Sequence, residues 1–172
     1  MISIRKGELA DVGAVAEIYA GAKEFMRRTG NMSQWAGEYP GEREICRDIA
    51  DGNQYVGVDE EGDIVGAFAF IVGDDPTYAE IDGNWLNDEP YGTIHRIASS
   101  GKCRGWVARS VEFCLKAVDN IRIDTHRDNG PMLAALACEG FVPVGTIICA
   151  DGTPREAFQL TKPLESRTHG DG

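Results

Sequence analysis

The sequence lacks the features that mark membrane proteins and nucleic-acid-binding proteins. No apolar run approaches the length of about 20 residues that spans a bilayer, and the N-terminal stretch MISIRKGELADVG has no apolar segment followed by a cleavage site. Cations are also scarce, because 17 Lys and Arg stand against 28 Asp and Glu and leave a net charge of −11. Non-specific binding to nucleic acid needs a surplus of Lys and Arg that releases phosphate counterions. We therefore expect neither a membrane nor a nucleic acid as a partner.

The cysteines form no disulfide framework and no zinc motif. Their number is odd, they are scattered, and no two of them form a CxxC pair. The five positions are Cys46, Cys103, Cys114, Cys138 and Cys149. This pattern is typical of reduced thiols in the cytoplasm, and we expect no metal site.

The length and composition indicate one folded domain. A chain of 172 residues has about the size of a single domain, and 42% hydrophobic residues are enough for a core. The sequence contains no internal repeat, low-complexity segment or interdomain linker. We expect one domain over residues 1–163 and a flexible polar tail over 164–172.

Apolar spacing predicts strands and helices along this domain. Period-two alternation and short apolar runs predict strands, whereas an apolar stripe at helical spacing predicts a helix. Strands are expected at 2–6, 54–58, 64–72, 91–99, 121–124, 142–149 and 155–160, and helices at 11–30, 41–50, 105–117 and 132–138. The order β-α-α-β-β-β-α-β-α-β-β predicts an α/β (α+β) fold with one mixed β-sheet flanked by helices.

The segment 97–114, IASSGKCRGWVARSVEFC, has the features of an anion-binding loop. A strand ends, a turn follows, and a helix begins near Gly105, where unpaired amides and the helix dipole provide partial positive charge. Lys102 and Arg104 stand beside this helix start, which favours a phosphate-bearing ligand, although both could equally be solvated loop charges. GxxxxGK[ST] and GxGxxG are missing, which argues against a P-loop and against a Rossmann dinucleotide site.

This segment resembles the phosphate-binding loop of the GNAT acetyltransferase family, which follows Q/R-x-x-G-x-G/A. The matching stretch is Lys102-Cys103-Arg104-Gly105-Trp106-Val107. Lys stands for Gln or Arg at its first position, and Val stands for Gly or Ala at its last. Downstream, Asn129 and the Gly-Phe pair at 140–141 resemble the family's N-x-x-A…G-F helix, and the strand order agrees from Ile2 to Leu160. More narrowly, the chain resembles bacterial members with an IHRIAS strand and a RIDTHRDN segment.

The resemblance implies a single-domain GNAT-like fold and acetyl-CoA as co-substrate. It implies that the strand over 91–99 holds the pantetheine arm, that the loop amides hold the pyrophosphate, and that Asn129 lies near the thiol end. The residues that it assigns to the cofactor are Ile97, Ser99, Lys102, Cys103, Arg104, Gly105, Trp106, Val107, Ala108 and Asn129.

One departure from the family concerns the leaving thiolate. Many members carry a tyrosine five residues before the Phe of the Gly-Phe pair, and this tyrosine protonates the thiolate. Leu136 occupies that position here. Either another group supplies the proton or the thiolate leaves unaided. Cys138 follows two residues later, and we expect its thiol to pack in the core.

Two histidines are candidates for the base that deprotonates an amine. Strand alternation places His95 on one face with Glu89, Tyr91 and Ile97, and His126 closes the strand that begins at 121. For His95 the alternative is a half-buried side chain paired with a carboxylate. For His126 the alternative is a capping role in the DTHRDN turn.

Three further side chains are candidates around the acceptor. Tyr91 is a candidate proton donor to the thiolate, or else an aromatic packing residue. Trp35 falls in the region that covers the acceptor site in the family, or else joins two helices. Glu89 belongs to the acidic loop 73–90, which would attract a cationic amine unless it is only a solvated face.

The favoured function is that of an N-acetyltransferase. It would transfer an acetyl group from acetyl-CoA to a primary amine, either a small molecule or an N-terminal amine, by direct attack. A second class of function is a non-catalytic module that binds or senses acyl-CoA, which would explain Leu136. A third is a homodimeric interaction domain with a vestigial pocket.

Overall fold

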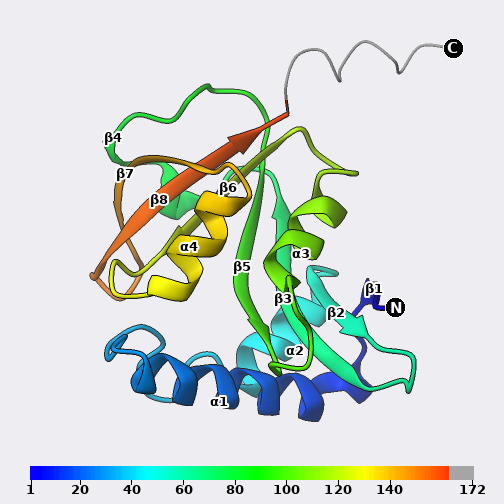
Figure 1. Cartoon of the computed structure of the whole chain (residues 1–172). Coiled ribbons are helices and arrows are strands. Elements are labelled where there is room, and N and C mark those ends of the chain that lie inside the picture. Colours follow the sequence, from blue (N-terminus) through cyan, green and yellow to red (C-terminus); the bar gives the residue numbers. More distant parts are fainter. Residues whose placement is uncertain (163–172) are drawn as a thin grey trace, which may run out of the picture.

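The computed structural model describes residues 1–162, and over this range the strands form one mixed sheet in the order β1-β2-β3-β5-β6-β8-β7-β4 (Figure 1). The strands are β1 Ser3–Lys6, β2 Gln54–Val58, β3 Ile64–Val72, β4 Asp82–Gly83, β5 Gly92–Ser99, β6 Asn120–Thr125, β7 Val142–Ile148 and β8 Pro154–Thr161. The helices are α1 Val12–Arg28, α2 Glu42–Ala50, α3 Trp106–Cys114 and α4 Gly130–Cys138, with 3-10 helices η1 Leu9–Asp11 and η2 Pro76–Tyr78. The expected tail over 164–172 lies outside the described residues.

The predicted fold class is confirmed, and the differences are local. Strand β4 lies inside the expected loop 73–90, and it has only two residues, which are too few to show a periodicity. Helix α3 ends at Cys114, three residues earlier than expected. Helix α4 begins at Gly130, two residues earlier than expected, because Pro131 is compatible with the first helical turn. Within residues 1–162, no helix combines the length and the apolar composition needed to cross a membrane.

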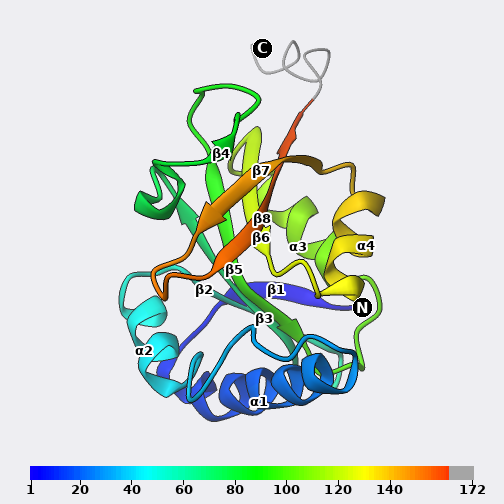
Figure 2. The same ribbon diagram turned by 90° about the vertical axis from the view of Figure 1, so that its left-hand side faces the viewer.

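Helices cover both faces of the sheet (Figure 2). On one face, α1 and α2 pack against β2, β3 and β5 around a core that includes Tyr19, Ile45 and Val56. On the other face, α3 and α4 enclose a larger core that includes Phe68, Trp106 and Leu136. Each helix therefore buries its apolar stripe against a face of the sheet. This burial is the main source of stability for such helices.

Two glycines determine how closely α3 approaches the sheet. A Cβ at Gly57 would lie 2.5 Å from Trp106 Cζ3, and a Cβ at Gly66 would lie 2.4 Å from Trp106 Cε2. The indole ring therefore lies directly on the backbone of β2 and β3, and its Nε1 donates to the Ala67 carbonyl at 3.4 Å. This contact fixes the N-terminus of α3 beside the end of β5.

Strands β5 and β6 are paired over only part of their length. Their parallel pairing comprises Gly92 with Ile121 and Thr93 with Arg122, and beyond these residues the strands diverge. Splaying at this point opens the middle of the sheet. The wedge between the two strands leads from the point of divergence towards the start of α3.

A bulge in β5 changes the direction of its side chains at the same place. Ala69 pairs with His95 and Ala67 with Ala98, so β5 has one residue more than β3 between these pairs. Arg96 has a φ of 49°, which is unusual for a residue with a side chain. The expected alternation is therefore wrong at Ile97, which packs with Ile94 in the α3–α4 core rather than on the face of His95.

Candidate functional site

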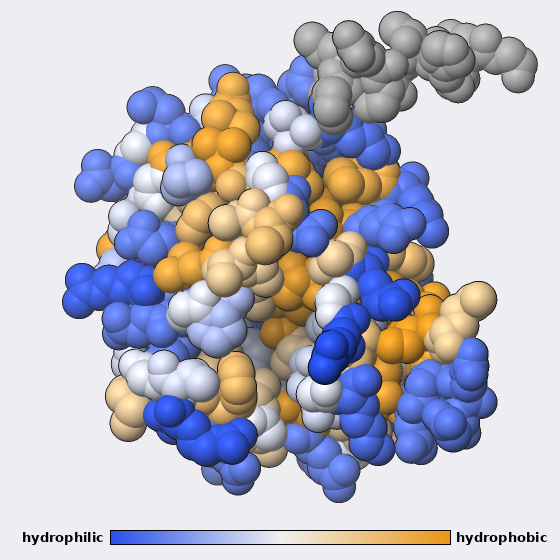
Figure 3. All heavy atoms as spheres, in the orientation of Figure 1, coloured by the Kyte–Doolittle hydropathy of each residue, from blue (hydrophilic) through white to orange (hydrophobic). Residues whose placement is uncertain are grey.

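A cavity of about 1070 Å³ lies between α1, the end of β5, the start of α3 and α4. The space-filling view shows this face hollowed between the α1 layer and α4 (Figure 3). Small residues of α1, among them Ala14, Gly21 and Ala22, form one wall. Met132, Ala135 and other α4 residues form the opposite wall. The cavity is therefore long enough and apolar enough for an extended ligand, and the start of α3 lies in its wall.

The polar part of the cavity is the turn between β5 and α3. Gly105 precedes the first residue of α3 with a φ of 68°, and an added Cβ there would meet no atom within 4 Å. The glycine thus adopts the left-handed conformation without strain and leaves the helix start open to the cavity. Lys102 lines the cavity with a side chain that is 70% exposed, and its Nζ lies 3.9 Å from Asp63 Oδ2. Amides of a first helical turn and a nearby lysine suit a phosphate group.

The structure gathers nearly all of the residues that the sequence assigned to the cofactor. Nine of the ten line the cavity, and Arg104 is the exception. Two of the nine contribute little through their side chains. Trp106 is buried against the sheet, and the Cys103 side chain is buried at the turn, where burial raises the pKa of its thiol. At these positions only the backbone is available to a ligand.

Asn129 lies where the cavity meets the splayed strands. Its Oδ1 accepts a hydrogen bond from the Met132 amide at 3.3 Å and so caps α4. Its Nδ2 donates to Gln34 Oε1 at 3.2 Å, and Gln34 also accepts a bond from Asn31 at 2.7 Å. The segment between α1 and α2 is thereby tied to the start of α4. Neither Gln34 nor Asn31 was indicated by the sequence, because 95 residues separate Gln34 from Asn129.

The α4 helix carries no phenol at the position where many GNAT members have one. Leu136 is fully buried in the core between α3 and the sheet, so it contributes packing and no proton. The expected core position of Cys138 is wrong, because this residue is exposed and lines the cavity. Helix α4 turns a stripe made of Met132, Ala135 and Cys138 towards the cavity, so Cys138 lies on the cavity side of the helix.

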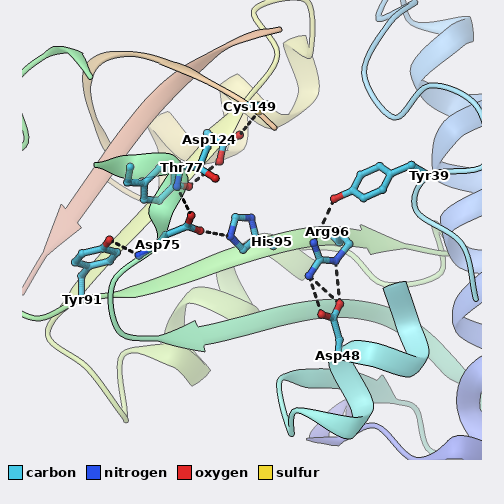
Figure 4. Close-up of polar contacts among 10 residues, drawn as sticks. Tyr39, Asp48, Asp75, Thr77, Tyr91, His95, Arg96, Asp124 and Cys149 are labelled. Atoms are coloured by element: carbon cyan, nitrogen blue, oxygen red, sulfur yellow. Dashed lines mark hydrogen bonds and ion pairs between the residues drawn. The ribbon is translucent and has the colours of Figure 1, made fainter. Parts of the chain in front are cut away.

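His95 forms a hydrogen-bond contact with a carboxylate beside the splayed strands (Figure 4). Its Nε2 lies 2.7 Å from Asp75 Oδ2, and the imidazole is 22% exposed. Burial disfavours the ionised Asp75, but the hydrogen bonds from His95 and Thr77 outweigh burial and lower the pKa of this carboxyl. His95 is itself not among the residues that line the large cavity, and it lies two residues before Ile97, where β5 begins to line it.

Asp124 of β6 and His95 of β5 face each other across the divergence, because each lies two residues beyond the last pair of the two strands, Thr93 with Arg122. Tyr78 connects the two sides: its hydroxyl donates to Asp124 Oδ1 at 2.6 Å, and its ring centroid lies 6.4 Å from that of His95. Burial and the Asp124 charge raise the pKa of Tyr78 well above its ordinary value, so the phenol stays protonated. In the same way, burial and Asp124 raise the pKa of the Cys149 thiol to about 12.

Tyr91 and Glu89 lie away from the large cavity and line a second one of about 610 Å³. The Tyr91 hydroxyl accepts a hydrogen bond from the Asp75 amide at 2.8 Å, and its ring lies 3.9 Å from the Arg122 guanidinium carbon. The side chain is buried. This position argues against Tyr91 as a proton donor to a thiolate in the large cavity.

His126 and Trp35 have structural contacts that occupy them. The His126 Nδ1 accepts from the Asp128 amide at 3.1 Å, and its Nε2 lies 3.2 Å from Ser33 Oγ, so both ring nitrogens have partners. Trp35 packs edge-on against Tyr19 with ring centroids 5.5 Å apart. The capping role of His126 and the helix-joining role of Trp35, which the sequence left open, both agree with these contacts.

No family model and no curated protein matches this chain. Several solved structures are similar to it. An acetyltransferase of the GNAT family from Streptococcus agalactiae 2603 is 29% identical, with a TM-score of 0.85, and the match covers 94% of this chain and 96% of that one. A GNAT-family acetyltransferase from Listeria monocytogenes 4b F2365 is 18% identical, with a TM-score of 0.69 over 93% of this chain and 94% of that one.

A third similar structure was solved with ligands. It is AAC(6')-Ib in complex with ribostamycin and coenzyme A, and it is 20% identical with a TM-score of 0.60 over 99% of each chain. These neighbours agree with this chain in the mixed sheet and the flanking helices, so its fold is the GNAT fold. The neighbours are acetyltransferases, which supports an acyltransferase activity for this chain.

Proposed function

We propose that this chain, which has the GNAT acetyltransferase fold, transfers an acetyl group from acetyl-CoA to a basic primary amine. The observation that carries the proposal is that a glycine-containing helix start lies in the wall of a long cavity, and that this cavity runs along the end of β5 to Ile97, two residues from His95, where β5 has diverged from β6. The small-molecule or N-terminal amine would approach from the side of His95.

The cavity fits coenzyme A in shape and in chemistry. The open backbone around Gly105 would take the pyrophosphate, with Lys102 at the rim, and the end of β5 would pair with the pantetheine arm. The acetyl group would then lie between β5 and β6. Its carbonyl would be held in a water-poor wedge, where oriented amides are most effective against developing negative charge.

The groups around the wedge favour a cationic acceptor. Asp124 is half-buried, and no Lys, Arg or His of the described chain lies within ion-pair distance of its carboxylate. A half-buried carboxylate without a cation is a favourable place for an ammonium group. The net charge of −11 attracts cations to the molecule as a whole.

The reaction requires one proton acceptor before attack and one proton donor after it. His95 takes a proton from the bound ammonium, and the neutral nitrogen attacks the thioester carbonyl. A C–N bond forms, the C–S bond breaks, and the electron pair leaves with sulfur. Because Leu136 replaces the usual tyrosine, no phenol of α4 protonates the thiolate. The attacking nitrogen loses its second proton as the amide forms, and this proton passes to the sulfur.

The test is a screen of amines for acetyl-CoA-dependent release of free CoA thiol. The panel should contain basic diamines, neutral aminoalcohols, amino acids and peptides with a free N-terminus. We expect turnover with basic amines, and His95→Ala should lower kcat by about 10²- to 10⁴-fold while the Kd for acetyl-CoA stays the same. Tight acetyl-CoA binding without release from any amine would instead support an acyl-CoA sensor.

A further inference from the structure

We infer that Asp75 is a positioning residue for His95 and that it makes Nδ1 the ring atom that accepts the proton from the amine. The inference rests on the proposed acetyl transfer. It concerns a carboxylate that is 20 residues distant from the histidine in the chain and that belongs to the long segment between β3 and β5.

Asp75 is held rigidly on the His95 side of the sheet (Figure 4). Its Oδ1 accepts a hydrogen bond from the Thr77 amide at 2.9 Å, which caps η2, and its Oδ2 contacts His95 at 2.7 Å. Its own amide donates to the Tyr91 hydroxyl at 2.8 Å, and the Gly73 amide donates to the Tyr91 carbonyl at 3.0 Å. Tyr91 therefore anchors both ends of the short segment that presents the carboxylate.

The contact determines the tautomer of a neutral His95. An ionised carboxylate can only accept hydrogen bonds, so the nitrogen that faces it, Nε2, must carry the hydrogen. The lone pair of the neutral ring is then on Nδ1. No hydrogen bond within residues 1–162 engages Nδ1, and the imidazole is 22% exposed, so this nitrogen has an unused lone pair for a ligand. A carboxylate in this position also stabilises the imidazolium that forms after proton transfer.

The bulge is anchored next to His95 in the chain. Arg96, the residue with a φ of 49°, donates two hydrogen bonds of 2.9 Å to Asp48 of α2 and a third of 3.2 Å to the Tyr39 hydroxyl. These bonds fix the backbone next to His95. The backbone of His95 thus adjoins an anchored bulge and its imidazole contacts an anchored carboxylate, which is the kind of support that a catalytic base requires.

The first arm of the test measures the tautomer in the unmodified protein. Long-range 1H–15N correlation spectra of the imidazole groups distinguish Nε2–H from Nδ1–H, and the chain has only three histidines to assign. The His95→Gln variant identifies the signals of His95 by their loss. We expect the Nε2–H form for the neutral imidazole, and an Nδ1–H form would overturn the inference. This arm does not depend on the acceptor.

The second arm is kinetic and uses Asp75→Asn. Asn retains the oxygen that caps η2, so the fold should persist. We expect kcat to fall by about 10- to 10³-fold, which is less than the loss expected when the general base itself is removed. The Kd for acetyl-CoA should be unchanged. In a His95→Ala background the same change should have no further effect. The control Asp119→Asn removes a carboxylate that pairs with Lys162, and it should leave kcat unchanged.

The two arms separate this inference from the proposed function. A normal kcat in Asp75→Asn, or an additive loss in the double variant, would overturn the positioning role even if the enzyme acetylates amines. If no amine is acetylated by the unmodified protein, the proposed function fails, and the tautomer measurement still decides whether Asp75 orients the ring.

Discussion

Replacing Gly105 by Glu tests the phosphate-binding role of the α3 start. A carboxylate about 4 Å from a phosphate costs about 1 kcal/mol in water and about 4 kcal/mol at an effective dielectric constant of 20. The turn lies at the wall of a half-open cavity, so an intermediate cost of about 2–3 kcal/mol applies. This corresponds to a Kd for acetyl-CoA that rises by at least about 30-fold. Isothermal titration calorimetry measures this change directly.

The same substitution also affects the fold, and a matched glycine separates the two effects. Gly105 has a φ of 68° and Gly152 a φ of 80°, and an added Cβ meets no atom within 4 Å at either position. A side chain in the left-handed region costs about 1–2 kcal/mol, which lowers Tm by about 2–8 °C in a chain of this length. Gly152 lies in the β7–β8 turn, outside the lining of the cavity. Gly152→Glu should therefore lower Tm equally and leave the Kd unchanged. An unchanged Kd in Gly105→Glu, or an equal loss of affinity in Gly152→Glu, would refute the assignment.

Three further changes test other parts of the site and its frame. Lys102→Ala should weaken acetyl-CoA binding by about 1 kcal/mol, or about fivefold by calorimetry, because the side chain is 70% exposed; no loss would remove Lys102 from the phosphate site. Gly66→Ala should lower the free energy of unfolding by about 1–3 kcal/mol because its Cβ would overlap the Trp106 ring. The control Gly13→Ala, whose Cβ meets no atom within 4 Å, should be neutral or stabilising. Equal denaturation midpoints for the two variants would contradict the packing argument. The KM for a basic amine should rise with ionic strength because exposed charges are screened over about 10 Å at 0.1 M salt, and a salt-independent KM would argue against charge attraction of the acceptor.

The sequence predicts the helices and strands of this molecule well, because these elements depend on local patterns. Apolar periodicity locates the four helices and every strand except β4. The glycine turn before α3 is visible in the sequence because glycine is typical of turns, and α3 begins at Trp106, directly after Gly105, as expected. The cavity-lining residues follow from that turn and from the order of the strands.

The details of the reacting groups depend on contacts that no local pattern encodes. The β5 bulge has a positive φ at Arg96, a residue type that gives no signal for it, and it moves Ile97 to the opposite face from His95. Asp75 is one of several acidic residues in its segment, and only folding selects it as the partner of His95. Ser33 reaches His126 across 93 residues of sequence. Long-range pairing of this kind is determined by the tertiary structure alone.

The most direct test of the account follows a labelled acetyl group from donor to product. The protein is incubated with 13C-acetyl-CoA and the best basic amine from the screen, and mass spectrometry quantifies the labelled amide against free CoA. The account predicts equal amounts of labelled amide and CoA with the unmodified protein, and a loss of both with His95→Ala. Acetyl-CoA that binds in the cavity but yields no labelled amide with any amine would contradict it.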